Sequence, residues 1–309
     1  MKFPNDSDKL STSNIDNIFA ETDPQPQPAL VLKKEQKNSI DIEPIKLLYH
    51  MVDNTIRRCN PLIQLILKDA SLKPEHFSAL VNVKISTLQL GGKCKKLSEL
   101  YVDDANISKL RFATFDVSDF LTKLTDSLNR LISNYINGEV HFKNYTDKIV
   151  YAEFDPNRLS SALLNLVDNA IVHGKTDNKN VYISLREKGD NIHISVKDKG
   201  EGIKESEVEN LLNVTEPTLY SIDGVPSNIS GIGLALCKKY VTEMGGKLSF
   251  KNQKIGVKFT ISLPKSTGKS STGMREVKDF NVDIVDLLMS MADSLYLSLK
   301  ECDSNNEIN

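Results

Sequence analysis

The chain has 309 residues, which is enough for two domains of ordinary size. Hydrophobic residues make up 39% and charged residues 26%, as in a globular protein with polar segments attached. The 39 Lys and Arg residues nearly balance the 41 Asp and Glu residues, which argues against a strongly basic nucleic-acid binder. No stretch approaches the roughly 20 apolar residues of a membrane span, and the N-terminal region has no apolar signal core. We therefore expect a cytoplasmic protein with no membrane span and no nucleic-acid partner.

Residues 1–41 are rich in Asn, Asp, Ser, Pro and Gln. Such a segment buries too little apolar surface to offset the loss of chain entropy on folding. We expect a disordered N-terminal tail.

Residues 42–112 have the pattern of a helical hairpin. Apolar positions recur at alternating spacings of four and three residues, which is the seam of a helix packed in a coiled coil or bundle. The seam consists of Ile45, Tyr49, Val52, Ile56, Cys59, Ile63 and Ile66. A break before Pro74 leads to a second helix over about 75–110, although Gly91-Gly92 in its middle disfavours a continuous helix. One hairpin has a narrow core, so we expect a homodimer built on a four-helix bundle.

Residues 113–264 mix the two periodicities. Helices are expected over 117–136, 156–173 and 232–244, and strands over 140–142, 149–152, 181–186, 192–197, 247–251 and 257–263. Because these elements do not alternate strictly, they favour an α+β fold, a sandwich of one mixed sheet with helices on one face. Residues 265–309 are expected to be a linker followed by an amphipathic helix from Phe280, which more often packs on its own domain than docks elsewhere.

Two asparagines lie four residues apart in the helix expected over 156–173. Asn165 and Asn169 therefore project from one face of that helix. An amide oxygen is a hard ligand that suits Mg²⁺, which usually keeps waters and substrate phosphates as its other ligands.

Two glycine-containing segments follow. Asp198 stands at the end of an expected strand, with Gly200 and Gly202 just after it. A carboxylate there can accept a hydrogen bond from an exocyclic amine such as that of adenine. Gly231 and Gly233 open the helix over 232–244, where free N–H groups and the positive helix end suit phosphate.

Together these segments resemble the N box and the two glycine boxes of the Bergerat-type ATPases, a group that includes histidine kinases, gyrases, mismatch-repair proteins and a heat-shock chaperone family. The stretch from Leu234 to Ser249 is most similar to the sensor histidine kinases, as are the upstream hairpin and Asp155-Pro-Asn-Arg-Leu159. The resemblance covers about residues 42–264.

The resemblance implies a role for each motif residue. Asn169 is the expected Mg²⁺ ligand, Asn165 its neighbour, and Asp198 the partner of adenine in bound ATP. The glycines expected to shape the nucleotide pocket are Gly200, Gly202, Gly231 and Gly233. Residues 204–230 are the expected mobile lid. His173 falls where the family often places a residue against the nucleotide, although an ordinary helix-end histidine is an equal alternative.

The chain departs from the family pattern at two places in this unit. The Phe-rich lid motif survives only as Glu216-Pro217-Thr218, without a phenylalanine. Val172 stands where many members have a basic residue that meets a phosphate. These changes leave the expected adenine and metal groups in place.

The family transfers the γ-phosphoryl group of ATP to a histidine on the first hairpin helix. His50 is the histidine in that stretch, and its position beside the seam predicts that the imidazole faces solvent. Met51 replaces the acidic residue that normally assists the imidazole, a contribution of roughly 10²–10⁴-fold. Asp53 lies close to the same helix face. Asn54 stands where the family positions a water for dephosphorylating a partner.

We therefore expect a sensor histidine kinase-like protein that transfers phosphate from MgATP to His50 and then to an aspartate of a response regulator. One alternative is a weak or inactive dimer that binds ATP and regulates a partner. Another is a phosphatase that uses Asn54. The related serine kinases and anti-sigma proteins lack a dimerisation hairpin, so the seam counts against that class. His50 as an ordinary exposed helix residue also remains open.

Overall fold

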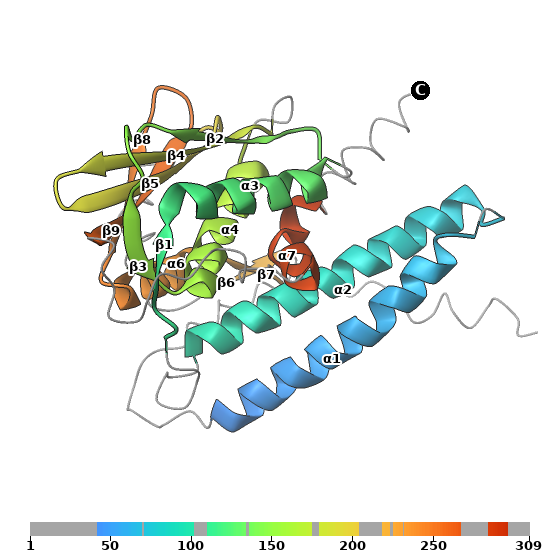
Figure 1. Ribbon diagram of the computed structural model, residues 1–309. Coiled ribbons are helices and arrows are strands. Elements are labelled where there is room, and N and C mark those ends of the chain that lie inside the picture. Colours follow the sequence, from blue (N-terminus) through green and yellow to red (C-terminus); the bar gives the residue numbers. More distant parts are fainter. Residues whose placement is uncertain are drawn as a thin grey trace, which may run out of the picture.

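Two long antiparallel helices lie beside a larger unit of helices and β-strands in the computed structural model of the chain (Figure 1). The structure describes residues 42–69, 71–101, 110–133, 136–174, 179–203, 218–222, 225–230, 232–266 and 284–295. The expected disordered tail lies outside these ranges. Within them, no helix has both the length and the apolar character that crossing a bilayer requires.

Helices α1 (Ile42–Ile66) and α2 (Pro74–Tyr101) form the expected hairpin. Near its turn, Nζ of Lys84 donates a hydrogen bond to Oε1 of Gln64 at 2.6 Å. On α1, the seam residues Ile56 and Ile63 are 3% and 9% exposed, whereas Ile66 at the end of the helix is 46% exposed. The second helix ends before the expected position near 110, and residues 102–109 lie outside the described part of the chain.

Helix α2 runs without interruption through Gly91-Gly92. These two glycines are where α2 contacts Met289 of the C-terminal helix. A Cβ atom on Gly91 would lie 2.7 Å from Sδ of Met289, and one on Gly92 would overlap the backbone carbonyl of Met289. Each glycine costs a helix about 1 kcal/mol relative to alanine. Here the missing side chains allow a C-terminal helix to approach the backbone of α2.

The larger unit is the expected α+β fold. Its strands are β1 (Ala113–Asp116), β2 (Val140–Asn144), β3 (Tyr151–Phe154), β4 (Val181–Lys188), β5 (Asn191–Lys197), β8 (Lys247–Asn252) and β9 (Val257–Ser266). They form a 7-stranded sheet in the order β1-β3-β9-β5-β4-β2, with β8 paired to β9. The pairing of β2 with β4 is parallel and the remaining pairs are antiparallel, so the sheet is mixed.

One face of the sheet is covered by helices α3 (Val117–Ile132), α4 (Pro156–Val172) and α6 (Ile232–Glu243) (Figure 1). Alternate residues of each strand point into this core, as Val181 and Ile183 of β4 do. Burying such a side chain contributes about 1.5–3 kcal/mol, which explains why an alternating sequence folds as a strand here.

Three details differ from the expectations. Strand β1 was not expected, because four residues are too few to show a period. The segment expected to be a polar lid contains a two-stranded hairpin, β6 (Thr218–Ile222) and β7 (Val225–Ser230). Strand β9 continues to Ser266, beyond the expected start of the linker at 265.

The C-terminal helix α7 (Ile284–Ser290) continues after a turn as helical residues 292–295. It lies between the hairpin and the larger unit (Figure 1). Its side chains join two apolar clusters: Leu287, Met291 and Leu295 enter the core of the larger unit, and Met289 and Ala292 pack with Ile56 and Leu88 of the hairpin. The expected amphipathic helix thus packs on its own chain, and it contacts both units.

Candidate functional site

Asp198 follows β5 directly and is 7% exposed. Its Oδ1 accepts hydrogen bonds from the backbone N–H groups of Gly200 at 2.8 Å and Val257 at 3.1 Å. Oδ2 takes part in neither bond. The carboxylate is therefore fixed by two charge-assisted bonds, and its second oxygen can accept from an amine brought to that side.

Close backbone packing at two glycines positions this carboxylate. Gly256 has a φ of 77°, and a Cβ atom there would overlap the backbone carbonyl of Asp198. A Cβ atom on Gly200 would overlap the backbone carbonyl of His173, at the end of α4. The loop after β5 therefore lies against the end of the helix that carries the two asparagines.

Asn252 holds the second part of that loop. Its Oδ1 accepts from the N–H of Ile203 at 3.0 Å and its Nδ2 donates to the carbonyl of the same residue at 2.8 Å. Gly202, just before Ile203, has a φ of 86°, a conformation that favours glycine. The side-chain amide of Asn252 thus satisfies both backbone polar groups of Ile203, as a neighbouring strand would.

The second glycine segment lies beside Asn165. A Cβ atom on Gly233 would lie 3.0 Å from Oδ1 of Asn165, so the backbone at the start of α6 is close to this amide. Asn165 is 3% exposed, and its Nδ2 donates to the carbonyl of Ser161 at 2.9 Å. Its Oδ1 is buried and accepts no hydrogen bond from any described residue. An unsatisfied buried acceptor is costly, so this oxygen is suited to a donor supplied by a ligand or a water.

Asn169 lies one turn further along α4 and is half-buried. Its carbonyl accepts from the N–H of His173 at 2.9 Å, and the side chain of His173 is exposed. No group of three or more His, Cys, Asp or Glu side chains within the described ranges could hold a metal ion. A divalent cation here would depend on amide and phosphate oxygens, which fits the free Oδ1 of Asn165.

Asp168, next to Asn169, connects this helix to α7. Ser294 donates to Oδ1 of Asp168 from its hydroxyl at 2.5 Å and from its backbone N–H at 3.2 Å. Burial raises the pKa of Asp168 to about 6, although Lys96 and the bonds from Ser294 oppose the rise. The C-terminal helix therefore stabilises the helix that carries both asparagines.

The structure brings most of the expected site residues together. Asp198, Gly200 and His173 meet at one end of α4, and Asn165 meets Gly233 at the start of α6. Gly231 and the lid residues 204–217 lie outside the described part of the chain. Sequence reasoning missed Asn252 and Gly256, because Asn252 acts on Ile203 from 49 positions away and Gly256 packs on Asp198 from 58 positions away.

The expected acceptor histidine lies on the other unit. His50 is exposed on α1, as predicted from its place beside the seam, and Asn54 is exposed one turn later. Met51 is 59% exposed. Asp53 bonds through Oδ2 to Nε of Arg57 at 2.9 Å, so its carboxylate is held along the helix rather than at the imidazole.

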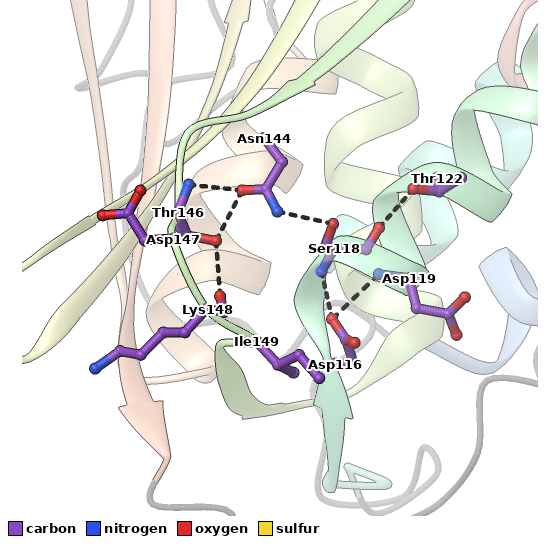
Figure 2. Close-up of a pocket in the computed structure, with 9 residues that line it drawn as sticks. All are labelled: Asp116, Ser118, Asp119, Thr122, Asn144, Thr146, Asp147, Lys148 and Ile149. Carbon is purple, nitrogen blue, oxygen red and sulfur yellow. Dashed lines mark hydrogen bonds between the residues drawn. The ribbon is translucent and has the colours of Figure 1, made fainter.

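A pocket of about 400 Å³ lies elsewhere, at the start of α3, and includes none of the motif residues (Figure 2). Asp116 caps α3 by accepting from the N–H groups of Ser118 and Asp119 at 2.9 and 3.2 Å. Oδ1 of Asn144 accepts from the N–H and the hydroxyl of Thr146 at 2.9 and 2.8 Å. These bonds belong to a helix cap and a turn, so they account for the polar residues that line the pocket without a ligand.

Comparison with known proteins relates part of the larger unit to a described family. Residues 154–267 match the family described as "Histidine kinase-, DNA gyrase B-, and HSP90-like ATPase". The chain is 35% identical over 113 residues to the sensor histidine kinase RcsC of Escherichia coli (strain K12), and equally so to RcsC of Salmonella typhimurium. Each match covers 36% of this chain and 11% of the relative, so the chain corresponds to about a tenth of these proteins.

The fold also resembles that of a solved structure. A structure of full-length ShkA in complex with AMPPNP matches with a TM-score of 0.55 and 19% identity, over 75% of this chain and 47% of that one. At this identity the likeness concerns the fold alone.

Proposed function

We propose, from the premise that residues 154–267 form an ATPase domain of the sensor histidine kinase type, that the protein binds MgATP between α4, the loop after β5 and the start of α6. Oδ2 of Asp198 accepts from the adenine amine. The amide groups of Asn165 and Asn169 would hold Mg²⁺ and the phosphates, and the bound metal would reduce the phosphate charge. His173 and the glycines line the site.

The observation that carries this proposal is the meeting of three segments far apart in sequence. Gly233 packs on Asn165, Gly200 packs on the carbonyl of His173, and Asp198 is buried with one oxygen tied to the backbone. A purely structural carboxylate and amide would be expected to pair with each other or with the backbone completely. Here a buried amide oxygen is left for another donor.

We further propose that His50 receives the γ-phosphoryl group. An imidazole nitrogen attacks phosphorus in line with the β–γ bridging oxygen, an N–P bond forms, and the P–O bond breaks to release ADP. The ring proton passes to solvent, because Met51 offers no base and Asp53 is bonded to Arg57. A response-regulator aspartate then accepts the phosphoryl group from His50. His50 is exposed, as a group that reacts with two different partners must be.

We infer that the active form is a homodimer of the hairpin. Apolar side chains along one face of α1 and α2 are 51–68% exposed: Leu48, Met51, Leu62, Leu65, Val83 and Leu90. Exposed apolar residues at heptad spacing fit a second copy of the same hairpin, which would complete a four-helix bundle.

The test is incubation of the full chain with γ-labelled MgATP, followed by a search for acid-labile, alkali-stable label. We expect label on the wild type and none on His50→Gln or Asn169→Ala. The matched controls are His76→Gln and Asn157→Ala, exposed residues of α2 and α4, which should label normally. Label on His50→Gln would exclude His50 as the acceptor.

A second candidate function is a dimer that binds ATP without transferring phosphate. The observation that favours it is the surroundings of His50, where Met51 replaces an acid and Asp53 is held by Arg57. Nucleotide binding without label in any variant would support it. A phosphatase that uses the exposed Asn54 would instead release phosphate from a phosphorylated regulator, and Asn54→Ala would remove that activity.

A further inference from the structure

The face of the sheet opposite the helices is strongly basic. We call the outward side-chain positions of β2, β4, β5, β8 and β9 the open sheet face. Its Lys and Arg residues are Lys143, Arg186, Lys188, Lys197, Lys247, Lys251 and Lys258, and its other residues are His, Tyr, Ser, Thr, Asn and Pro. No Asp or Glu occupies an outward position on these five strands. The near-neutral charge of the whole chain therefore conceals a cationic surface.

Strand register places like charges side by side. Lys197 of β5 pairs with Lys258 of β9, and Lys258 pairs with Lys251 of β8. Neighbouring strands lie about 4.8 Å apart, and like charges directly opposite each other destabilise a sheet. This row of lysines therefore works against folding, which indicates that it is retained for another reason.

Within the described part of the chain, the positive charges of this face have no carboxylate partners. Among the described residues, no ion pair joins the Lys and Arg residues of the open sheet face to a carboxylate. The nearby carboxylates are engaged at the margins: Glu187 pairs with Lys265, and Glu139 lies 3.8 Å from Nδ1 of His141. Burial lowers the pKa of His193 in the middle of the face, and Lys188 and Lys258 lower it further.

The cations surround a centre of small hydroxyl side chains. Ser195 and Thr260 share a hydrogen bond of 2.9 Å, and Ser184 and Ser249 extend the same row across the sheet. Long cationic side chains thus form the rim and short polar ones the middle. The result is a broad two-dimensional array that spans five strands rather than a single line of charge.

The aromatic rings of the face already have partners. The ring of Tyr182 stacks on His141 at 5.1 Å and has Nζ of Lys199 5.0 Å away. The ring of Tyr145, beside the face, lies under Arg186 at 3.8 Å. A platform for single-stranded nucleic acid needs free ring faces on which bases can stack, and these rings are occupied.

We propose that the open sheet face binds the surface of a membrane that contains anionic phospholipids. A layer of phosphate headgroups is itself a two-dimensional array of negative charge, and clustered lysines bind such layers by electrostatic attraction. The short polar side chains in the centre leave room for headgroups between the long cationic side chains. The face lies on the side of the sheet away from α4 and α6, so a bound membrane leaves the ATPase site open.

The test measures co-flotation of the full chain with vesicles of phosphatidylcholine alone or with about 40% phosphatidylglycerol, at low and high salt. The variant is Lys188→Glu/Lys247→Glu, which changes two exposed residues on opposite margins of the face. The matched control is Lys68→Glu/Lys73→Glu, an equal charge change at the hairpin turn. Each lysine near an anionic surface contributes about fivefold to binding, so the variant should bind at least about 20-fold more weakly.

Binding to anionic vesicles that falls with salt, survives in the control and is lost in the variant supports the proposal. Thermal melting of each variant checks that it is folded. Absence of flotation, or equal loss in the control, overturns the proposal. A parallel titration with a labelled single-stranded and a labelled duplex oligonucleotide decides against the membrane if either binds the wild type and the vesicles do not.

Discussion

The larger unit of helices and strands, called the ATPase unit from here on, and the hairpin bury their apolar residues to very different extents. In the ATPase unit, Phe120, Phe154 and Leu163 are 0% exposed within one continuous core. In the hairpin, Leu62 and Leu65 remain 61% and 68% exposed, and a small cluster around Ile56 relies on α7. The first unit has the core of a domain that folds on its own, whereas the second needs other surfaces. The difference fits the proposal that nucleotide binding belongs to one unit and association to the other.

The largest effect is expected inside the ATPase unit, at Gly256. Gly256→Ala places a side chain at a φ of 77° and against the backbone of Asp198. Strain and overlap together should cost about 4 kcal/mol of unfolding free energy, and nucleotide affinity should fall because Asp198 moves. Gly189→Ala is the control, since its φ is 61° and no atom lies within 4 Å of the added Cβ. Equal destabilisation in thermal and urea melts would show that contact with Asp198 is unimportant.

The second-largest loss of stability is expected from a change at the contact between the hairpin and α7. Gly92→Val pushes against the carbonyl of Met289 and should cost about 1–3 kcal/mol by displacing α7. Hydrogen exchange of residues 284–295 should become faster. Ser86→Val adds a similar side chain on the exposed side of α2 and should leave that exchange unchanged. Unchanged, slow exchange of residues 284–295 in the Gly92→Val variant would mean that α7 does not depend on its contact with Gly92.

A smaller loss of unfolding free energy is expected from a change at the contact between the C-terminal helix and the ATPase unit. Ser294→Ala removes the hydroxyl that bonds to Asp168, which should cost about 1–2 kcal/mol because a buried carboxyl loses a donor. Urea unfolding measures the loss. Ser290→Ala, on the half-buried side of the same helix, is the comparison and should change stability by less. If the two variants unfold alike, the bond to Asp168 contributes nothing measurable.

The smallest effect on folding and the clearest effect on association should come from the exposed hairpin face. Leu62→Glu/Val83→Glu changes residues that are 61% and 51% exposed, so the melting of the ATPase unit should stay within the usual range of surface changes. Sedimentation should show a dimer for the wild type and a monomer for the variant. A monomeric wild type would contradict the proposed homodimer.

Local patterns were sufficient to predict most of the ATPase unit. Alternating strands and capped helices such as α4, which begins after Asp155, depend on neighbouring residues. Asp198 and the asparagines were found because their motifs are short and contiguous. Asn252 and Gly256 were missed, since they meet Asp198 and its loop only through the turn between β8 and β9.

The role of the glycines in α2 could not be predicted. From the sequence alone, Gly91-Gly92 disfavours a continuous helix, and its partner Met289 comes almost 200 residues later. The hairpin β6–β7 was missed because its strands have only five and six residues and their apolar residues do not alternate with polar ones. The charge of the open sheet face depends on strand register, which a single sequence does not specify.

The most direct measurement of the central claim is an equilibrium titration of the full chain with MgATP, comparing the wild type with Asp198→Asn. This substitution keeps an oxygen for the two backbone bonds but can place an N–H₂ group where the adenine amine needs an acceptor. We predict saturable binding by the wild type and by the exposed control Asp190→Asn, and at least tenfold weaker binding by Asp198→Asn. Equal binding by all three proteins, or no saturable binding by the wild type, would contradict the nucleotide site described here.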